Sequence, residues 1–438
     1  MTYQDCLLYF NSFINYEKII VRKKGMPYRL NRFKAFLKFL DNPQNTLRCV
    51  HVAGSKGKGS VCAFTANILK EAGFKVGFYT SPHLTDIRER IRILTPFNKD
   101  KSNVFNGIIT KKEFVRLIEF HKPKIEAFCK NSGYGRISFF EFITAIAFIY
   151  FNKKRVDFAV IETGMGGRLD ATNTVKALVN VITPISYEHM YALGNTLKKI
   201  AKEKSAIIKN KSSVVCIDKP KDALGVIRQR CKKVKAELFI VNKDILFKGM
   251  ENNFFISGIL GKYNKLKISL IGEHQLVNAS LAVGAVECLQ KKGINIELDK
   301  IKRGLYNTIW PGRCEVIQRR PLVILDGAQN VASVKALIKT VLASFKFSRI
   351  ILVLGISQDK DITGICNQLR RVSDKVILTC ADNPRATQPE KLAKYFRQKD
   401  LFITSDVKEA RRKAIKLAQK DDLVLVTGSL FLIGEYRQ

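Results

Sequence analysis

Residues 50–60 read VHVAGSKGKGS, and this stretch decides the fold. An apolar strand runs into a glycine-rich turn before a helical pattern, so that backbone N–H groups and a helix N-terminus converge on one point. Lys58 adds positive charge and a nearby hydroxyl can reach Mg²⁺. The strict P-loop spacing would require glycine at Val52 and a hydroxyl at Gly59. The stretch therefore predicts a phosphate site of irregular spacing, with a ligand-free glycine turn as the alternative.

Length and composition indicate a globular protein of two domains. The chain has 438 residues, of which 46% are apolar and 26% charged, and single cores stop growing well below this length. The most apolar run, 137–151, is too short to span a bilayer comfortably and contains Glu141. The first residues lack the basic start and apolar core of a signal peptide, so we expect a cytoplasmic protein without a membrane partner.

The formal charge of +38 suggests nucleic acid as the first partner to consider. The basic clusters are short and scattered, however, and no aromatic residues interleave with them as in a stacking platform. We therefore expect no specific nucleic-acid site, and a polyanionic small substrate accounts for the charge equally well. The ten cysteines are far apart and follow no zinc-site spacing, which favours reduced, structural thiols.

Apolar runs of strand length alternate with helical patterns, which predicts α/β domains with mostly parallel sheets. In the first domain, expected at 1–298, strands are predicted at 47–53, 74–79, 156–162, 178–183 and 213–217, and an antiparallel insertion at 238–271. A helix at 274–291 would close it. The pattern restarts after a linker near 296–301, with strands at 322–326, 350–355, 375–380 and 423–427. This second unit, 299–438, reads as a smaller Rossmann-like domain.

Two acidic residues are predicted at the carboxyl ends of strands, where open α/β sheets gather their ligands. Glu162 ends the strand 156–162 and is a candidate Mg²⁺ ligand, although a solvated acid would look the same. The glycine-rich segment 164–167 behind it permits close backbone approach, and Asp170 follows. Asp326 ends the strand 322–326, and with Arg313 it is predicted to hold a nucleotide from the second domain.

Lys204 is the most unusual residue of the sequence. Thr196 is predicted to cap a helix on which Lys204 shares the apolar face of Leu197, Ile200 and Ile208. A lysine on such a face must snorkel, pair with an acid or lose its proton. The residues favour snorkelling or pairing with Glu203 or another acid, but a neutral lysine can also form an anionic carbamate with CO₂.

Two further segments carry candidate residues with simpler interpretations. His189 lies beyond the strand 178–183 and is a possible metal ligand, although a lone histidine is more often structural. Ser138 and Glu141 match a capping box at the start of a helix, and that role accounts for both.

Taken in order, these segments resemble the folylpolyglutamate synthase and dihydrofolate synthase branch of the Mur ligase superfamily. The resemblance covers residues 27–436 and is carried by the segments 27–33, 51–60, 79–84, 162–173 and 326–330. The irregular loop is this family's form of the P-loop. The resemblance implies a P-loop Mur-ligase-type domain with a mostly parallel sheet and a C-terminal Rossmann-like domain.

The resemblance also implies a set of site residues, most of them from the motifs just described. ATP would be bound by Gly57, Lys58, Gly59, Ser60, Asn278, Arg313 and Asp326. The metal ligands would be Ser81, Glu162, His189 and, if carbamylated, Lys204, and the catalytic residues would be Lys58, His189 and Lys204. Substrate contacts would come from Tyr28, Arg29, Leu30, Ser138, Phe139, Phe140, Glu141, Leu169, Asp170, Ala171, Gln329 and Ser429.

The implied activity is ATP-dependent amide formation between L-glutamate and dihydropteroate, a folate or both, with Mg²⁺ and a K⁺ requirement left open. Monomers are usual in the family, so we expect a monomer. One departure affects the glutamate side, because the family's Asp-Gly-Ala-His-Asn motif has Gln329 in place of histidine. The alternatives are a Mur-type ligase with another acceptor and a basic P-loop ATPase that binds nucleic acid, although the latter leaves Lys204 unexplained.

Overall fold

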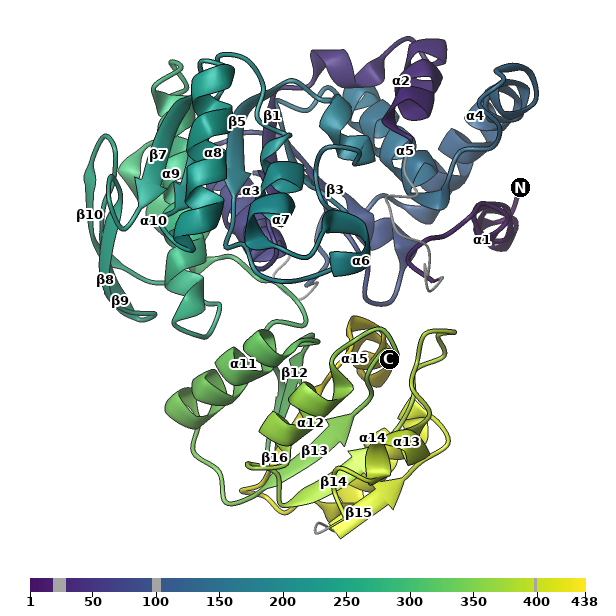
Figure 1. Ribbon diagram of the computed structural model, residues 1–438, viewed down its shortest axis with the longest axis vertical. Helices are drawn as coiled ribbons and strands as arrows, with labels where there is room; N and C mark the ends of the chain where they lie inside the picture. Colours follow the sequence, from purple (N-terminus) through teal and green to yellow (C-terminus); the bar gives the residue numbers. More distant parts are fainter. Residues whose placement is uncertain (19–28, 97–103, 398–399) are drawn as a thin grey trace.

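The computed structural model describes residues 1–18, 29–96, 104–397 and 400–438, which fold into two α/β domains placed one above the other (Figure 1). Each domain has its own sheet with helices on both faces. This confirms the predicted fold class. In the described residues, no helix is both long and apolar enough to cross a membrane.

The first domain is built on a seven-stranded sheet in the order β3-β2-β4-β1-β5-β6-β7. All neighbours are parallel except β2 and β3. The strands are β1 (Cys49–Ala53), β2 (Val76–Tyr79), β3 (Ile91–Leu94), β4 (Phe158–Glu162), β5 (Ala177–Ile182), β6 (Ser213–Ile217) and β7 (Glu237–Val241). The central strands are buried on both faces, which explains why they read as continuous apolar runs rather than alternating ones.

Helices cover both faces of this sheet. One core contains side chains of α3 (Lys58–Glu71), α9 (His274–Gln290) and α10 (Leu298–Tyr306). The other face is covered by α1 (Tyr3–Asn11), α2 (Leu30–Phe39), α4 (Lys111–Asn131), α5 (Phe139–Lys153), α7 (Leu197–Ser205) and α8 (Lys221–Lys233). Three short 3₁₀ turns lie at Pro43–Thr46, Ile87–Arg90 and Ala171–Thr174, and the one-turn helix α6 at Met190–Leu193.

The antiparallel insertion is smaller than predicted. It comprises β8 (Leu246–Met250), β9 (Asn253–Ser257) and β10 (Lys262–Leu266), whereas residues 237–241 form β7, which pairs in parallel with β6. The prediction that the insertion begins at 238 was therefore wrong. The prediction relied on Gly258 and Gly261, but these two glycines lie only in the turn between β9 and β10.

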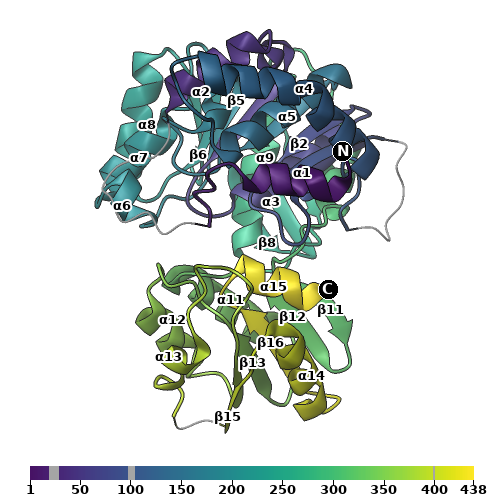
Figure 2. The same ribbon diagram turned by 90° about the vertical axis from the view of Figure 1, so that its right-hand side faces the viewer.

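The second domain contains a six-stranded sheet in the order β11-β12-β16-β13-β14-β15. Its strands are β11 (Glu315–Arg319), β12 (Leu322–Asp326), β13 (Ile350–Leu354), β14 (Lys375–Leu378), β15 (Asp400–Ile403) and β16 (Leu423–Thr427), and only β11 is antiparallel to its neighbour. The helices are α11 (Val331–Ser344), α12 (Ile362–Leu369), α13 (Pro389–Ala393), α14 (Val407–Leu417) and α15 (Leu430–Arg437). Figure 2 shows α15 at the end of this domain that faces the first domain.

The chain passes from the first domain to the second shortly after α10. Ile301 and Leu305 of this helix belong to the core of the first sheet, and a carbon added at Gly304 would lie 2.4 Å from the Cα of Ile68 on α3. The second core begins at Cys314. We therefore propose that the boundary lies between residues 306 and 314, a few residues beyond the expected one at 298.

Candidate active site

The phosphate-binding loop lies at the carboxyl edge of the first sheet, between β1 and α3. Gly57 has φ 81°, a conformation that favours glycine, and a carbon added there would lie 2.3 Å from Oδ1 of Asn278. Asn278 of α9 is buried and thus packs directly against the loop. The structure therefore brings together Gly57 and Asn278, which are 221 residues apart (278 − 57) in the sequence.

The two halves of the loop use their backbone groups differently. The N–H groups of Ser55 and Lys56 donate to the carbonyl of Pro184, at 3.1 and 3.3 Å, which fastens the first half to the segment after β5. The second half enters α3, whose first-turn N–H groups have no carbonyl of a preceding turn to bind. Lys58, Gly59 and Ser60 form this turn, so an anion is favoured there.

Glu162 lies beside this loop, because β4 is the direct neighbour of β1 and pairs Glu162 with Val52. Its carboxylate is buried, which raises its pKa, while the charge of Lys58 opposes that effect. The backbone N–H of Ser81, which follows β2, donates to the Glu162 carboxylate at 3.3 Å. The structure thus brings Glu162 and Ser81 together, because β2 and β4 are parallel neighbours whose carboxyl ends share one edge.

A small cavity of about 40 Å³ joins these groups to the second domain. Its lining includes Gly59, Ser81, Glu162, Trp310, Arg313 and Leu430. Arg313 lies close enough for its charge to oppose the rise in the pKa of Glu162. An acid, a phosphate-binding helix and a guanidinium therefore meet where the domains join. Trp310, which the sequence did not single out, packs against Gly59 and the ring of Phe78.

Lys204 is buried on α7, whose predicted cap Thr196 is confirmed. Its Nζ donates to Oε1 of Glu188 and to the carbonyl of Gly54, both at 2.6 Å. Burial lowers the pKa of Lys204, and the Glu188 carboxylate opposes that effect. Pairing with an acid is thus confirmed, and the acid is Glu188 rather than Glu203. Glu203 instead binds Arg168, with 2.9 Å between Oε1 and Nε.

His189 follows β5 and lies next to Glu188, the partner of Lys204. It has φ 44° and its Nδ1 lies 3.5 Å from the hydroxyl of Tyr191. Burial lowers the pKa of its imidazole to about 4, so the ring is neutral at neutral pH. In the described ranges, no three His, Cys, Asp or Glu side chains form a group that could hold a metal ion.

The segment after β4 is held together by Asp170. Its carboxylate accepts hydrogen bonds from the N–H of Met165 at 2.9 Å and from the N–H and hydroxyl of Thr172 at 3.0 and 2.6 Å. Burial raises the pKa of Asp170, and these hydrogen bonds oppose the effect. Leu169 is half-buried and Ala171 buried beside it. Phe140 reaches this segment, since a carbon added at Gly164 would lie 2.5 Å from its Cζ.

Glu141 carries an interaction that sequence reasoning missed. The capping box is confirmed, because Ser138 accepts from the N–H of Glu141 at 3.3 Å and Glu141 accepts from that of Ser138 at 2.6 Å. The same carboxylate binds Arg32 of α2 through two hydrogen bonds of 2.6 and 3.2 Å. Both side chains are buried. The available signal was an arginine on the apolar face that α2 forms with Phe33 and Phe36.

Three more predicted substrate residues lie at the starts of α2 and α5. Phe139 is buried, and its ring faces the Arg90 guanidinium at 5.3 Å. Arg29 is exposed and Leu30 half-buried at the start of α2. Tyr28 lies outside the described residues.

In the second domain, the predicted residues lie at the strand ends that face the first domain. Asp326 pairs with Thr427 across β12 and β16, and its carboxylate accepts from the N–H groups of Cys314 and Ala328 at 2.7 and 2.8 Å. Ser429 caps α15 through the N–H of Phe431. Gln329 is half-buried at the start of α11, where its N–H donates to the hydroxyl of Ser333.

Comparison with known proteins places this geometry in a class. The fold is that of a Mur ligase: the model of the "Mur ligase middle domain" matches residues 52–286, and that of the "Mur ligase, glutamate ligase domain" matches residues 312–430. The two matches coincide with the two sheets and their strand-end residues.

Relatives that match nearly the whole chain show which branch of the Mur ligases it belongs to. The chain is 36% identical to a dihydrofolate synthase/folylpolyglutamate synthase of Bacillus subtilis, over 95% of this chain and 96% of that protein. Its structure matches a Mycobacterium tuberculosis folylpolyglutamate synthase complexed with ADP, with TM-score 0.88 and 28% identity over 99% and 97% of the chains. E. coli FolC in complex with DHPP and ADP matches with TM-score 0.84 and 26% identity over 100% and 97%. The chain belongs to the folylpolyglutamate synthase/dihydrofolate synthase family.

Proposed function

We propose that this protein is an ATP-dependent ligase that joins L-glutamate to dihydropteroate, to folates or to both. The observation that carries the proposal is the meeting of the Lys58 helix turn, Glu162 and Arg313 around one cavity at the domain junction. The relatives support the acceptor class through their names, and two of the matched structures contain ADP.

The chemistry follows from the charges of the site. The γ-phosphoryl group of ATP passes to an acceptor carboxylate and leaves ADP and an acyl phosphate. The amine of L-glutamate then attacks the acyl carbon, phosphate departs and a proton is lost, so that an amide remains. The first turn of α3 and Lys58 bind the phosphates, and Arg313 adds charge from the second domain. Closure of the two domains over this cavity would keep water from the acyl phosphate.

The donors near the loop fit Mg²⁺, which requires few protein ligands when phosphate and water supply the rest. Glu162 and the hydroxyl of Ser81 offer oxygen beside the phosphate-binding turn. His189 is neutral, as a ligand must be, and lies near enough for Lys58 to act on its pKa. When bound, Mg²⁺ would offset negative charge on the phosphoryl oxygens. Lys204 in the charged, Glu188-paired state positions the loop through the Gly54 carbonyl.

We assign the acceptor to the region around Phe140, Leu169 and Ala171, and the incoming glutamate to the second-domain residues Gln329 and Ser429. Phe140 supports this assignment because it packs on the glycine segment beside Glu162. Ser138, Glu141 and Asp170 then support this region rather than recognise substrate, since Ser138 and Glu141 bind each other and Asp170 binds Met165 and Thr172. We also propose that the protein acts as a monomer in the cytoplasm.

Phosphate release from ATP and Mg²⁺, with L-glutamate and either dihydropteroate or tetrahydrofolate, tests the proposal. Mass analysis should show one added glutamyl unit on at least one acceptor. Lys58→Ala should abolish the product, whereas Lys232→Ala, an exposed lysine on α8, should leave it unchanged. The proposal fails if neither acceptor gains a glutamyl unit while the protein binds ATP and is folded.

A further inference from the structure

One apolar side chain of the first domain packs against a core cluster of the second domain. Leu84 follows the Ser81 segment of the cavity and packs against the second-domain cluster that includes Leu430, Ile433 and Tyr436. Among the partly buried hydrophobic residues that pack against this cluster in the described part of the chain, Leu84 is the one from the first domain. The contact therefore joins the two domains through a residue three positions from the candidate metal ligand Ser81 (84 − 81).

The second domain leaves room for Leu84 at Gly434, and Gly312, before β11, lies at van der Waals distance from it. A carbon added at Gly434, on α15, would lie 2.2 Å from the carbonyl oxygen of Leu84. A carbon added at Gly312 would lie 3.5 Å from Cδ1 of Leu84. The backbone of α15 thus touches the backbone of the Leu84 loop, and any side chain at 434 would push the two domains apart.

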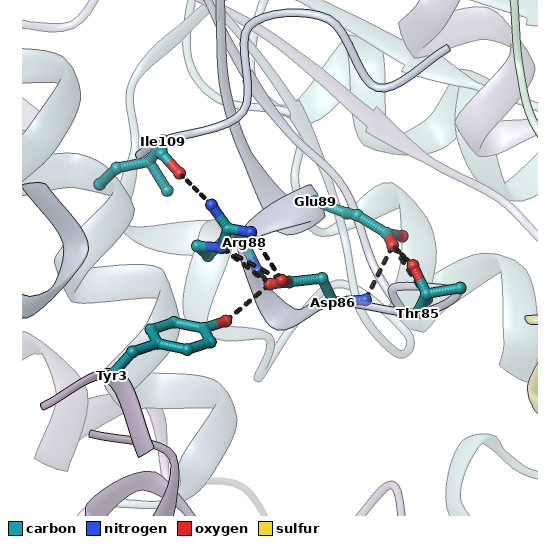
Figure 3. Close-up of polar contacts among 6 residues, drawn as sticks. All are labelled: Tyr3, Thr85, Asp86, Arg88, Glu89 and Ile109. Atoms are coloured by element: carbon teal, nitrogen blue, oxygen red, sulfur yellow. Dashed lines mark hydrogen bonds and ion pairs between the residues drawn. The ribbon is translucent and has the colours of Figure 1, made fainter. Parts of the chain in front are cut away.

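The Leu84 loop is held rigidly by the first domain (Figure 3). The buried Glu89 carboxylate accepts from the N–H groups of Leu84 at 2.7 Å, Thr85 at 2.9 Å and Asp86 at 2.8 Å, and from the Thr85 hydroxyl at 2.6 Å. Because these four hydrogen bonds engage both carboxylate oxygens of Glu89, the loop has little conformational freedom.

A second acid extends this support to the N-terminal helix. Asp86 accepts from the hydroxyl of Tyr3 on α1 at 2.8 Å and from the guanidinium of Arg88, which also donates to the carbonyl of Ile109 at 3.2 Å (Figure 3). The loop is thereby tied to α1 and to the segment before α4. It is a fixed element of the first domain rather than a strand-end loop that adapts to its partner.

We propose that Leu84 is a positioning residue for the ligation reaction, because its contact with α15 sets the second domain, and hence Arg313, over the cleft between Ser81 and Glu162. The proposal rests on the proposed function. It differs from a purely structural contact because the cavity lining runs continuously from Ser81 through Leu84 and Glu89 to Leu430. A shift of about 1 Å between reacting groups is enough to reduce turnover strongly.

The position of the second domain can be followed by tryptophan fluorescence, without measuring activity. Trp310 is the only tryptophan, and its indole borders the cavity together with Leu430. Displacement of α15 would expose the indole to water and shift its emission to longer wavelength. Small-angle scattering would report the same displacement as a larger radius of gyration.

The test compares two variants with matched controls. Leu84→Ala removes this apolar side chain, and Leu342→Ala makes the same change at an exposed leucine of α11. Gly434→Ala wedges the contact open, and Gly225→Ala adds a methyl group to α8 where nothing lies within 4 Å. Gly434→Ala keeps the proposal testable if Leu84→Ala does not fold.

Both contact variants should lower kcat about tenfold, leave the KM for ATP within about threefold and red-shift the Trp310 emission, whereas both controls should behave as wild type. The proposal is overturned if kcat stays within about twofold, or if kcat falls while emission and scattering are unchanged. If the wild-type protein ligates neither acceptor, the proposed function fails, and the Trp310 emission and scattering still decide whether Leu84 positions the second domain.

Discussion

The Nζ of Lys204 lies 2.6 Å from Oε1 of Glu188, and the same ammonium donates to the carbonyl of Gly54. One buried cation therefore connects the end of β1 with the segment that carries His189. The pair keeps the charged amine solvated by protein oxygens in a place where water has no access.

Glu188→Gln should destabilise the fold, because it leaves the Lys204 ammonium buried without a counter-charge. We expect the free energy of unfolding to fall by about 3 kcal/mol in urea denaturation. Glu188→Asp should retain most of that stability if the shorter carboxylate still reaches the amine. Equal stability of wild type and Glu188→Gln would contradict the pairing.

Lys204→Ala should remove most ligase activity while the protein stays folded, since the amine binds the backbone of the phosphate loop. The exposed Lys202 on the same helix provides the control, and Lys202→Ala should retain wild-type turnover. Intact mass measurement of the wild type in bicarbonate tests the carbamate separately, by an added carboxyl group that Lys204→Ala lacks. Full activity of Lys204→Ala would exclude both roles.

Arg32→Ala should cost about 3 kcal/mol of stability, because it strands the buried Glu141 carboxylate. The double variant Arg32→Met/Glu141→Met should be more stable than Arg32→Ala, since it buries no charge. A double-mutant cycle in urea gives the coupling energy directly. No coupling between the two positions would show that the pair contributes nothing to stability.

Acid should destabilise the protein below pH 6.5 through His51, which is fully buried on β1 and hydrogen-bonded to Thr172. Burial lowers its pKa from 6.5 to about 3, with Lys209 adding to the effect. The unfolded chain therefore takes up this proton below pH 6.5, whereas the folded chain does not until about pH 3. Stability is complete above this window and falls within it as the pH is lowered.

His83 adds a second such group, because burial and the neighbouring Arg90 lower its pKa to about 3 as well.

The His51 prediction is checked by urea denaturation between pH 6 and pH 4. The free energy of unfolding of His51→Gln should change with pH by about 1.4 kcal/mol per pH unit less than that of the wild type. An unchanged slope would mean that His51 is protonated in the folded state.

Gln329→His should retain activity or raise it, because it restores the residue usual in the family at a half-buried position just before α11. Neutral glutamine can donate and accept hydrogen bonds but cannot act as a cation or carry a proton. We expect kcat/KM for L-glutamate at or above the wild-type value, measured by phosphate release. A loss of more than about tenfold would contradict this account of the glutamate side.

Part of this site could be predicted from the sequence for a general reason. Parallel strands place their carboxyl ends on one edge, so the loop at 54–60, Glu162 and Asp326 could each be assigned to a ligand-binding edge from strand patterns alone. Local signals of the same kind predicted the Thr196 cap and the Ser138 capping box, which depend on neighbours within one turn.

The tertiary structure alone decided the partners across the chain. Helical periodicity showed that Lys204 faces the core, but not that Glu188 rather than Glu203 faces it there. The same holds for Arg32 and Glu141, 109 residues apart, and for Leu84 against Gly434. A sequence pattern specifies which face of an element is buried, whereas the identity of the opposing atoms depends on how distant elements pack.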